Sequence, residues 1–402
     1  MPIGCGRIGG CEINAPGIIW GISAHVIMHI MIDYTPAVHQ RAGIGRYTRG
    51  LVNGLMQLRP SYHFTLFVLG RSGAYHIPDR LPDNFTLRFV PLSDRWATVI
   101  WHRMNLPLPV EVLAGRADLF HGPSFTLPPT LMPCVLTVHD LSFLRYPQGA
   151  HPPLLRWLCK AVPRSVHRAR HILADSDNTR KDLIELMHVP PERITVIGAG
   201  IEEHFRRVED RDRLEAVRQR YWLPECFILG VSTLEPRKNF TGLIAAFNIL
   251  AAQPAHAHLH LVIAGGKGWN YEPIFAAAEA SPFRARIHFA GFVEDADLPA
   301  LYSLAQVFVF PSHYEGFGIP VLEAMACGTP VVCANNSSLP EVVGGAGVYC
   351  ETYAESIAGA IIRLLDDAQL RTKLVRTGLE RARLFTWERT ADQVRQAYHE
   401  VA

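Results

Sequence analysis

The amino-acid sequence predicts an α/β protein built on parallel sheets. Short apolar runs rich in β-branched residues alternate with helical stretches along the chain, as in strands joined by crossover helices. A length of 402 residues suits two domains of ordinary size, and no internal repeat or low-complexity tract occurs. With 49% apolar and only 19% charged residues, the chain can bury a large core.

Charge and cysteine content narrow the classes of function. A formal net charge of +2 argues against nucleic acid as the main partner. The eight cysteines include no C-x-x-C pair, so neither a zinc site nor a disulfide framework is indicated. This cysteine usage fits a reducing cytoplasm.

The N-terminal stretch is expected to stand apart from the fold. The run 13–32 is apolar, but Asn14, Pro16, His25 and His29 make it a poor membrane span, and no cleavage site of a signal peptide is evident. We expect the fold to begin near Met28. The expected organisation is a weakly ordered leader at 1–23, a first domain at 24–205, a second domain at 206–385 and a closing helix at 386–402.

The most informative stretch is VFVFPSHYEGFGIPVLEAMACGTPVV at 307–332. Its first four residues predict a buried strand, and the glycines that follow predict a tight loop. Pro320 suits the start of a helix and Gly328 its end, after which a second strand begins. This strand–loop–helix–strand unit places a helix N-terminus at the carboxyl edge of a sheet, where α/β proteins bind ligands.

Two carboxylates frame this loop, Glu315 at its start and Glu323 in the helix, eight positions later. Carboxylates accept hydrogen bonds and suit the paired hydroxyls of sugars and riboses. The backbone N–H groups of Phe317 and Gly318 can face a phosphate or sugar oxygen, because glycine allows close approach. The alternative is structural: Glu323 complements a helix dipole and Glu315 is a solvated loop acid.

In the first domain, a predicted strand at 26–33 is followed by Gly43-Ile44-Gly45 ahead of a helix. Such a pair of glycines can bind a phosphate but is more often a simple turn. The third glycine of the dinucleotide fingerprint is missing. His139 and Asp140 follow a buried strand at 134–138 and face the same crevice. His139 is either a ligand-binding residue or a structural histidine bonded to a carboxylate, and Asp140 is expected to orient the loop or the histidine.

In the second domain, Arg237 and Lys238 lie between a strand at 227–231 and a helix at 240–250. Cations in a strand-to-helix loop suit a diphosphate, and arginine adds bidentate geometry. The alternative is two solvated charges in a turn. A later strand, at 260–265, runs into Gly-Gly-Lys-Gly.

A basic run without acidic residues lies in the first domain, comprising Arg156, Lys160, Arg164, Arg168 and Arg170. Its spacing of four places most of these residues on one helical face. Pro163 is expected to divide the run into two short helices. The run is either a solvated face or a docking surface for anionic lipid.

The motif YEGFGIPVLEAMACGTPVV, followed by NNSSLPEVVGGAGVYC, resembles the E-x7-E signature of retaining glycosyltransferases of family 4 (group 1). The variant resembles the branch rich in bacterial GDP-mannose-dependent mannosyltransferases, and the resemblance covers about residues 28–400. It implies the GT-B fold, in which two Rossmann-like domains face each other across a cleft and the C-terminal helix crosses back to the first domain.

The resemblance also implies roles for residues of this chain. Glu315 would hold sugar hydroxyls, Glu323 the ribose, His139 the transferred sugar and Lys238 the leaving diphosphate. The family's usual arginine falls at Thr233, so Arg237 would replace it. The further donor-binding residues that the resemblance implies are Gly43, Gly45, Gly265, Gly266, Phe292, Phe317, Gly318 and Ile319.

The expected function is retaining transfer of a hexose, mannose from GDP-mannose by family analogy, to a saccharide or lipid-linked acceptor in cell-surface polysaccharide synthesis. No metal and no cofactor are expected, because no clustered D-x-D stands in a suitable loop. The expected location is the cytoplasm, with or without peripheral contact at the inner face of the membrane. Two alternatives are a nucleotide-sugar hydrolase or epimerase and a non-catalytic nucleotide-sugar-binding subunit of an assembly complex.

Overall fold

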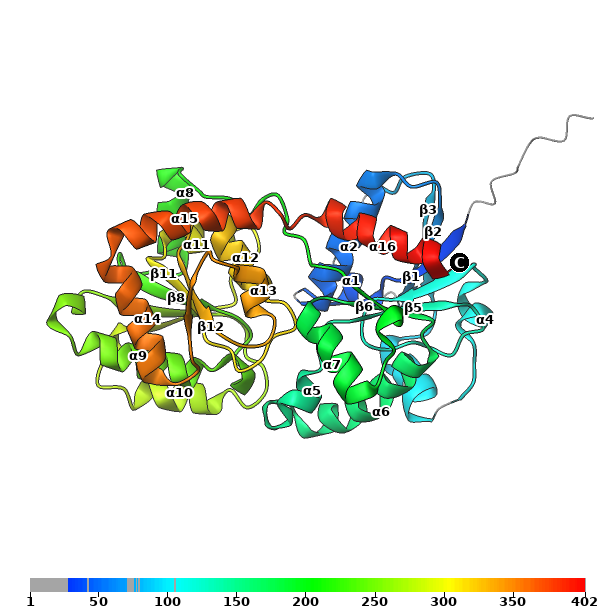
Figure 1. The fold of residues 1–402 in the computed structure, drawn as a ribbon, viewed down its shortest axis with the longest axis horizontal. Coiled ribbons are helices and arrows are strands. Elements are labelled where there is room, and N and C mark those ends of the chain that lie inside the picture. The colour runs from blue at the N-terminus through cyan, green and yellow to red at the C-terminus, as the bar shows by residue number, and fades with distance from the viewer. Residues whose placement is uncertain are drawn as a thin grey trace, which may run out of the picture.

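The computed structural model describes residues 28–41, 43–70, 76, 78, 80–104 and 106–401. The leader predicted at 1–23 lies outside the described residues. Two parallel sheets dominate the structure, and helices cover the faces of both (Figure 1). The α/β fold predicted from alternating strands and helices is confirmed.

The first sheet has the strand order β3-β2-β1-β4-β5-β6-β7. Its order reverses between β1 and β4, which opens a crevice at the carboxyl ends of these strands. The strands are β1 (His29–Asp33), β2 (His63–Leu69), β3 (Phe85–Val90), β4 (Leu119–Gly122), β5 (Cys134–Val138), β6 (His171–Ala174) and β7 (Ile194–Val196). The helices of this part are α1 (Thr35–His39), α2 (Ile44–Leu58), α3 (Asp94–Ala97), α4 (Val110–Ala114), α5 (Ser142–Arg145), α6 (Pro152–Arg168) and α7 (Asp177–Met187).

The second sheet has the order β10-β9-β8-β11-β12-β13, which reverses in the same way between β8 and β11. Its central strands are buried on both faces, as their unbroken apolar sequences require. The strands are β8 (Phe227–Val231), β9 (His260–Ala264), β10 (Ile287–Gly291), β11 (Val307–Phe310), β12 (Val331–Ala334) and β13 (Val348–Cys350). The helices are α8 (Arg211–Arg220), α9 (Phe240–Ala251), α10 (Glu272–Glu279), α11 (Leu298–Leu304), α12 (Ile319–Ala326), α13 (Leu339–Val343), α14 (Ala354–Asp366), α15 (Ala368–Ala382) and α16 (Trp387–Val401).

The last helix, α16, returns to the first domain and packs along α2 (Figure 1). The Tyr398 hydroxyl lies 2.6 Å from Nδ1 of His121 on β4, and Nε2 of His121 lies 2.8 Å from the Thr137 hydroxyl on β5. Burial lowers the pKa of His121 to about 3, so its ring is neutral and bonds to two hydroxyls. The predicted crossing of the closing helix is confirmed.

One local prediction is wrong. Pro163 does not divide the basic run, because α6 continues without interruption from Pro152 to Arg168. Pro163 lies on the exposed side of this helix, while the buried positions 161, 162, 165 and 166 hold the opposite side against the core. Packing of that side outweighs the helix bond that proline removes. Along the described residues, no helix combines the length and apolarity that a membrane crossing requires.

Candidate active site

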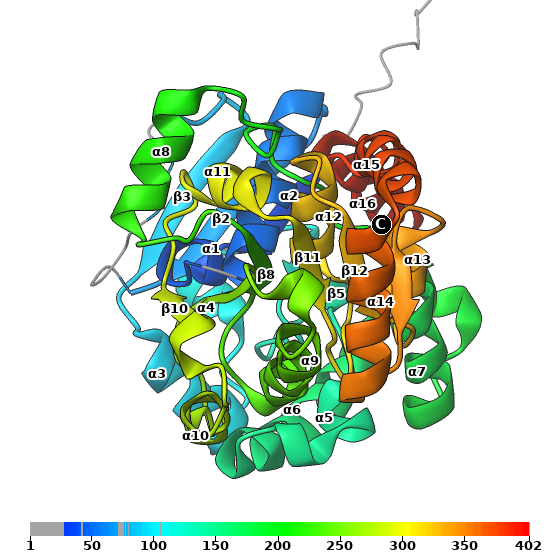
Figure 2. The same cartoon turned by 90° about the vertical axis from the view of Figure 1, so that its left-hand side faces the viewer.

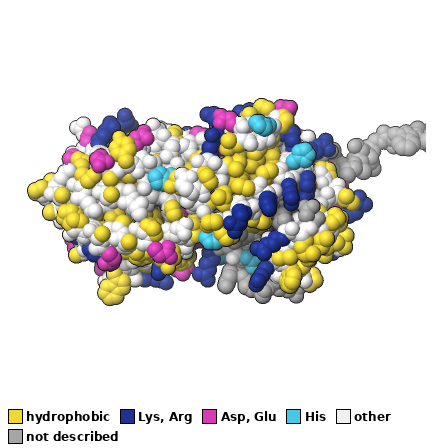
Figure 3. Space-filling model, turned by 90° about the horizontal axis from the view of Figure 1, so that it is seen from below, with side chains coloured by type: hydrophobic (Ala, Val, Ile, Leu, Met, Phe, Trp, Pro, Cys, Tyr) yellow, Lys and Arg dark blue, Asp and Glu magenta, His cyan; other side chains and the backbone are white. Residues whose placement is uncertain are grey.

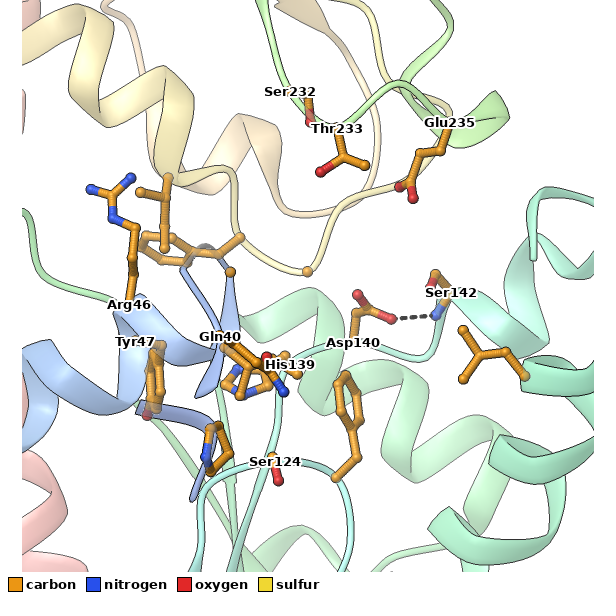
Figure 4. A pocket seen from close by; sticks show the side chains of 18 of the residues that line it. Gln40, Arg46, Tyr47, Ser124, His139, Asp140, Ser142, Ser232, Thr233 and Glu235 are labelled. Atoms are coloured by element: carbon orange, nitrogen blue, oxygen red, sulfur yellow. Dashed lines mark hydrogen bonds between the residues drawn. The ribbon is translucent and has the colours of Figure 1, made fainter. Parts of the chain in front are cut away.

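A cavity of about 820 Å³ lies between the two domains at the carboxyl edges of both sheets. Loops after β1, β4 and β5 line one side, and loops after β8, β9, β10 and β11 line the other. Figure 4 shows side chains from both sides, with His139 and Asp140 below and Thr233 and Glu235 above. The two topological switch points of the sheets therefore meet in one cleft.

The domains touch backbone to backbone inside this cleft. A Cβ atom on Gly316 would lie 2.1 Å from the His139 carbonyl oxygen and 2.8 Å from the Asp140 Cβ. No side chain fits at this position, so the glycine is required by the contact and not only by the turn. Nearby, the indole N–H of Trp269 donates to the Gly149 carbonyl at 2.6 Å, again between the domains.

Glu315 lies at the centre of a buried group of charges. Lys238 Nζ donates to one carboxylate oxygen at 2.7 Å, and Arg237 Nη1 donates to the other at 3.0 Å. Arg237 also pairs with Glu235 at 2.9 Å. Burial alone would raise the pKa of Glu315, but the two cations overcome it and hold the pKa below its usual value. Burial lowers the pKa of Lys238, although Glu315 opposes this shift.

Hydrogen bonds from the loop after β12 hold the loop that carries Glu315 in place. The Ser337 hydroxyl accepts from the Glu315 N–H at 2.9 Å. The buried Ser338 hydroxyl lies 3.0 Å from the Glu315 carbonyl and 2.9 Å from the Phe317 carbonyl. Gly318 ends the loop with φ +112°, a conformation that favours glycine, and α12 begins at the next residue.

Glu323 points from α12 toward the first domain and forms an ion pair across the domain interface. Arg46 Nη1 lies 2.6 Å from Glu323 Oε1, and the Tyr302 hydroxyl donates to Oε2 at 2.7 Å. Arg46 also donates to Glu202, in the segment that joins the domains, at 2.9 and 3.2 Å. Burial raises the pKa of Glu323, and the single shared cation only partly offsets this.

His139 is held within the first domain by both ring nitrogens. Nδ1 lies 2.7 Å from Asp175, and Nε2 lies 2.8 Å from the Pro123 carbonyl. Because both partners are acceptors, the ring bonds best as an imidazolium. Burial disfavours that charge, yet Asp175 and the Pro123 carbonyl raise the pKa of His139 above its usual value. Asp175 is thus the carboxylate that orients the histidine, whereas Asp140 accepts from the Ser142 N–H at 2.8 Å and orients the loop (Figure 4).

Most residues singled out from the sequence line this cleft, among them Thr233. Gly45 is not among the lining residues. A Cβ there would lie 2.2 Å from the Gln40 carbonyl oxygen, so this glycine allows α2 to pack closely against the end of α1. The predicted residues that line the cleft are Gly43, His139, Arg237, Lys238, Gly265, Gly266, Phe292, Glu315, Phe317, Gly318, Ile319 and Glu323. Among the described residues, no group of His, Cys, Asp or Glu has the arrangement of a metal site.

Comparison with known proteins decides the family. The sequence model described as Glycosyltransferase Family 4 matches residues 41–205, and the one described as Glycosyl transferases group 1 matches residues 221–381. The O-antigen chain mannosyltransferase B of Escherichia coli is 33% identical over 386 residues, which are 92% of this chain and 99% of that protein. The chain belongs to glycosyltransferase family 4.

Solved structures confirm the GT-B fold of this glycosyltransferase. Sucrose-phosphate synthase from Thermosynechococcus elongatus superposes with a TM-score of 0.72 at 22% identity, covering 93% of this chain and 98% of that structure. Anabaena HepE, solved in complex with UDP and glucose, gives 0.70 at 18% identity, covering 93% and 99%. The two facing domains predicted from the E-x7-E motif are therefore confirmed.

The cleft lining includes residues that were not predicted from the sequence, among them Arg46 and Asp33. Arg46 lies in the first turn of α2, directly after the glycine loop. A cation next to this possible phosphate-binding loop was the only local feature of the sequence that could have identified it. Asp33 ends β1, lines the cleft half-buried and accepts from the Thr35 N–H at 3.0 Å. Burial raises the pKa of Asp33 to about 6. An acid at a strand end in the cleft is suited to bind an acceptor hydroxyl.

Replacing Gly316 tests the contact between the domains. Gly316→Ala is expected to push the loop away from His139 and lower the glycosyl-transfer rate about a hundredfold, because a displacement of about 1 Å in a reacting site has that effect. Small-angle scattering should show a more open molecule. Gly345→Ala is the control, since a Cβ there would meet no atom within 4 Å. Equal scattering and rates for both variants would contradict this account of the cleft.

Replacing Asp33 tests whether its ionised carboxylate lowers the free energy of unfolding. Burial raises the pKa of Asp33 from 3.8 to about 6, so its stabilising contribution is present at low pH and is lost as the pH rises through 6. Asp33→Asn should therefore raise the free energy of unfolding by about 1–2 kcal/mol at pH 8 and by little at pH 4. Urea unfolding at both pH values measures this difference. The exposed Asp83→Asn is the control, and a gain from Asp33→Asn that does not depend on pH would refute the prediction.

Proposed function

We propose that this enzyme transfers mannose from GDP-mannose to a saccharide or lipid-linked acceptor, with retention of the anomeric configuration. The supporting observation is the ion-paired group of Glu315, Lys238 and Arg237 beside the N-terminus of α12. Glu323 lies about one turn into the same helix. This arrangement supplies anionic anchors for hydroxyls and cations for a diphosphate in one closed cleft. The name of the relative in Escherichia coli supports mannose as the sugar.

The leaving diphosphate would bind Lys238, Arg237 and the backbone N–H groups of the α12 N-terminus. These groups already lie together, so charge that develops on the phosphate oxygen is stabilised without reorganisation. Binding of the phosphate would withdraw the cations from Glu315, whose carboxylate would then accept from sugar hydroxyls. Glu323 would exchange Arg46 for the ribose hydroxyls.

The proposed reaction takes place on one face of the sugar. The bond from the anomeric carbon to the diphosphate oxygen breaks, and the acceptor hydroxyl oxygen bonds to the same carbon from the same side. The proton of that hydroxyl passes to the leaving phosphate oxygen. Asp33 and Ser124, at the ends of neighbouring strands on the first-domain side of the cleft, would orient the acceptor. The reaction as proposed requires no metal and no further cofactor.

The first domain also carries features suited to an acceptor at a membrane. Leu154, Trp157 and Leu158 of α6 line the cleft, whereas Arg156 and Lys160 of the same helix are exposed. Figure 3 shows basic side chains beside apolar ones over this part of the molecule. We include in the proposal that this face contacts anionic lipid while the cleft takes a lipid-linked acceptor.

Radiolabel transfer from GDP-mannose tests the proposed reaction. Lys238→Ala is expected to lower turnover by about 2–4 kcal/mol of transition-state stabilisation, roughly 30- to 1000-fold, because the leaving charge loses a cation. Lys267→Ala, in the neighbouring loop but outside the cleft lining, should retain turnover. Near-wild-type turnover of Lys238→Ala would remove this residue from the site.

A thermal-shift panel with GDP, UDP, ADP and TDP, with and without EDTA, identifies the donor base. A nucleotide at 100 times its dissociation constant stabilises by about 2.7 kcal/mol, which is readily measured. A GDP shift that survives EDTA and shrinks in Glu323→Ala is the expected result. A shift only with another base would overturn GDP-mannose, and no shift at all would favour a protein that does not use a nucleotide sugar.

Vesicle binding tests the membrane contact. Lys160→Glu combined with Arg164→Glu should weaken binding to vesicles containing anionic lipid at least about tenfold, because each basic residue near such a surface contributes about 1 kcal/mol. Lys373→Glu with Arg376→Glu, an exposed pair on α15, is the matched control. Equal binding of both double variants would exclude α6 as the contact.

A further inference from the structure

A second depression, of about 480 Å³, lies outside the active cleft along the edge strand β10. Residues at the end of α8 form one wall, and residues of α10 and of the turn before β10 form the other. Figure 2 shows α8, β10 and α10 along one edge of the second domain. None of the residues that line this depression lines the active cleft.

Trp222 at its rim is exposed in a way that the fold does not explain. Its side chain is 86% exposed, and its backbone has φ +54°, the left-handed region in which a bulky residue is an outlier. The residue directly follows the last turn of α8. The Trp222 N–H donates to the Gln219 carbonyl, and the Leu223 N–H donates to the Arg218 carbonyl. These two bonds form a helix-ending motif in which the left-handed residue is usually glycine.

The apolar contact of this helix end belongs to Leu223, which is buried in the core together with Val217. The Trp222 indole therefore contributes nothing to the helix end, and its backbone is strained there. A left-handed backbone held at a bulky residue motivates the search for a function of Trp222 outside folding. The flat indole face is available beside the depression.

The charges around the depression are balanced. Arg220 pairs with Asp297 at 3.0 Å, and Arg284 pairs with Glu279 at 2.7 Å. His288 bonds to His260 at 2.9 Å; burial together with neighbouring positive groups lowers the pKa of both rings, so they are neutral at pH 7. A surface of paired charges and neutral rings does not select phosphate, nucleic acid or acidic lipid.

We propose that this depression binds a neutral glycan chain, with Trp222 as the platform on which a sugar ring stacks. A pyranose ring has an apolar face of C–H groups and a rim of hydroxyls, which match an exposed indole flanked by Arg220, Arg284 and His288. The identity of the glycan as the growing product rests on the proposed function. Ala290 lines the depression and Phe292 lines the active cleft, so one strand end connects the two sites.

The consequence for catalysis is an anchor for long acceptors. A glycan acceptor that reaches from the cleft to Trp222 contacts the protein at both sites. The contact at Trp222 raises the effective concentration of the acceptor end at the cleft. A short acceptor reaches only the cleft. Loss of the platform therefore raises KM for long acceptors and leaves the kinetics of short ones unchanged.

Binding of a linear α-manno-oligosaccharide to the full chain, without donor, tests the site. Hydrogen exchange should show protection at 218–223 and 286–291, and the oligosaccharide should bind Trp222→Gly about tenfold more weakly, as for loss of an aromatic anchor. Trp222→Phe keeps an aromatic plane and should retain binding. Because glycine relieves the left-handed strain, Trp222→Gly should melt about 2–4 °C higher than the wild type.

Each other outcome overturns the inference. Protection confined to the cleft, or equal affinity of wild type and Trp222→Gly, would remove the glycan site even if the enzyme transfers mannose. A lower melting temperature of Trp222→Gly would assign the indole to the fold. A wild-type dimer that becomes monomeric in Trp222→Gly would make this face a contact between copies. Binding needs no turnover, so a positive result stands even if the donor is not GDP-mannose.

Discussion

The approach of the Gly316 backbone to the His139 carbonyl is the contact on which the active cleft depends. It brings the carboxyl edges of two separate sheets together, so that loops from both domains enclose one cavity. With this contact in place, the loop that carries Glu315 meets the first domain, and α12 directs Glu323 toward Arg46. A rigid scaffold on each side then positions functional groups on short loops.

The charged groups of the cleft have partners before any ligand is present. Buried charges are costly unless paired, so Glu315 has Lys238 and Arg237, and His139 has Asp175. The two glutamates of the motif differ in their surroundings. Glu315 faces two cations and its pKa is lowered, whereas Glu323 shares one cation with Glu202 and its pKa is raised. A ligand that exchanges partners with these groups avoids leaving a buried charge unpaired.

Local patterns predicted most of the architecture because each is encoded within a few residues. Buried strands, the Pro320 helix start and the Glu315–Glu323 spacing all fall in one segment. The cations at 237–238 also lie in a loop between a strand and a helix of the same domain, so their position could be predicted in the same way. Asp33 and Arg46 were missed because their roles arise only when distant segments meet. Gly45 lies outside the cleft lining, and its predicted contact with the donor stays a prediction, because a glycine needed for helix packing and one needed for a phosphate leave the same local pattern.

The bond between Tyr398 and His121 joins residues 277 positions apart, and both are fully buried in the first domain. At about 5–20 residues per second, a ribosome adds Tyr398 roughly 15–55 s after His121. During that interval the nascent first domain lacks the helix that covers α2, and all strands of the second domain are synthesised before that helix. The domain that begins first along the chain is therefore completed last, and an apolar surface stays uncovered until α16 arrives.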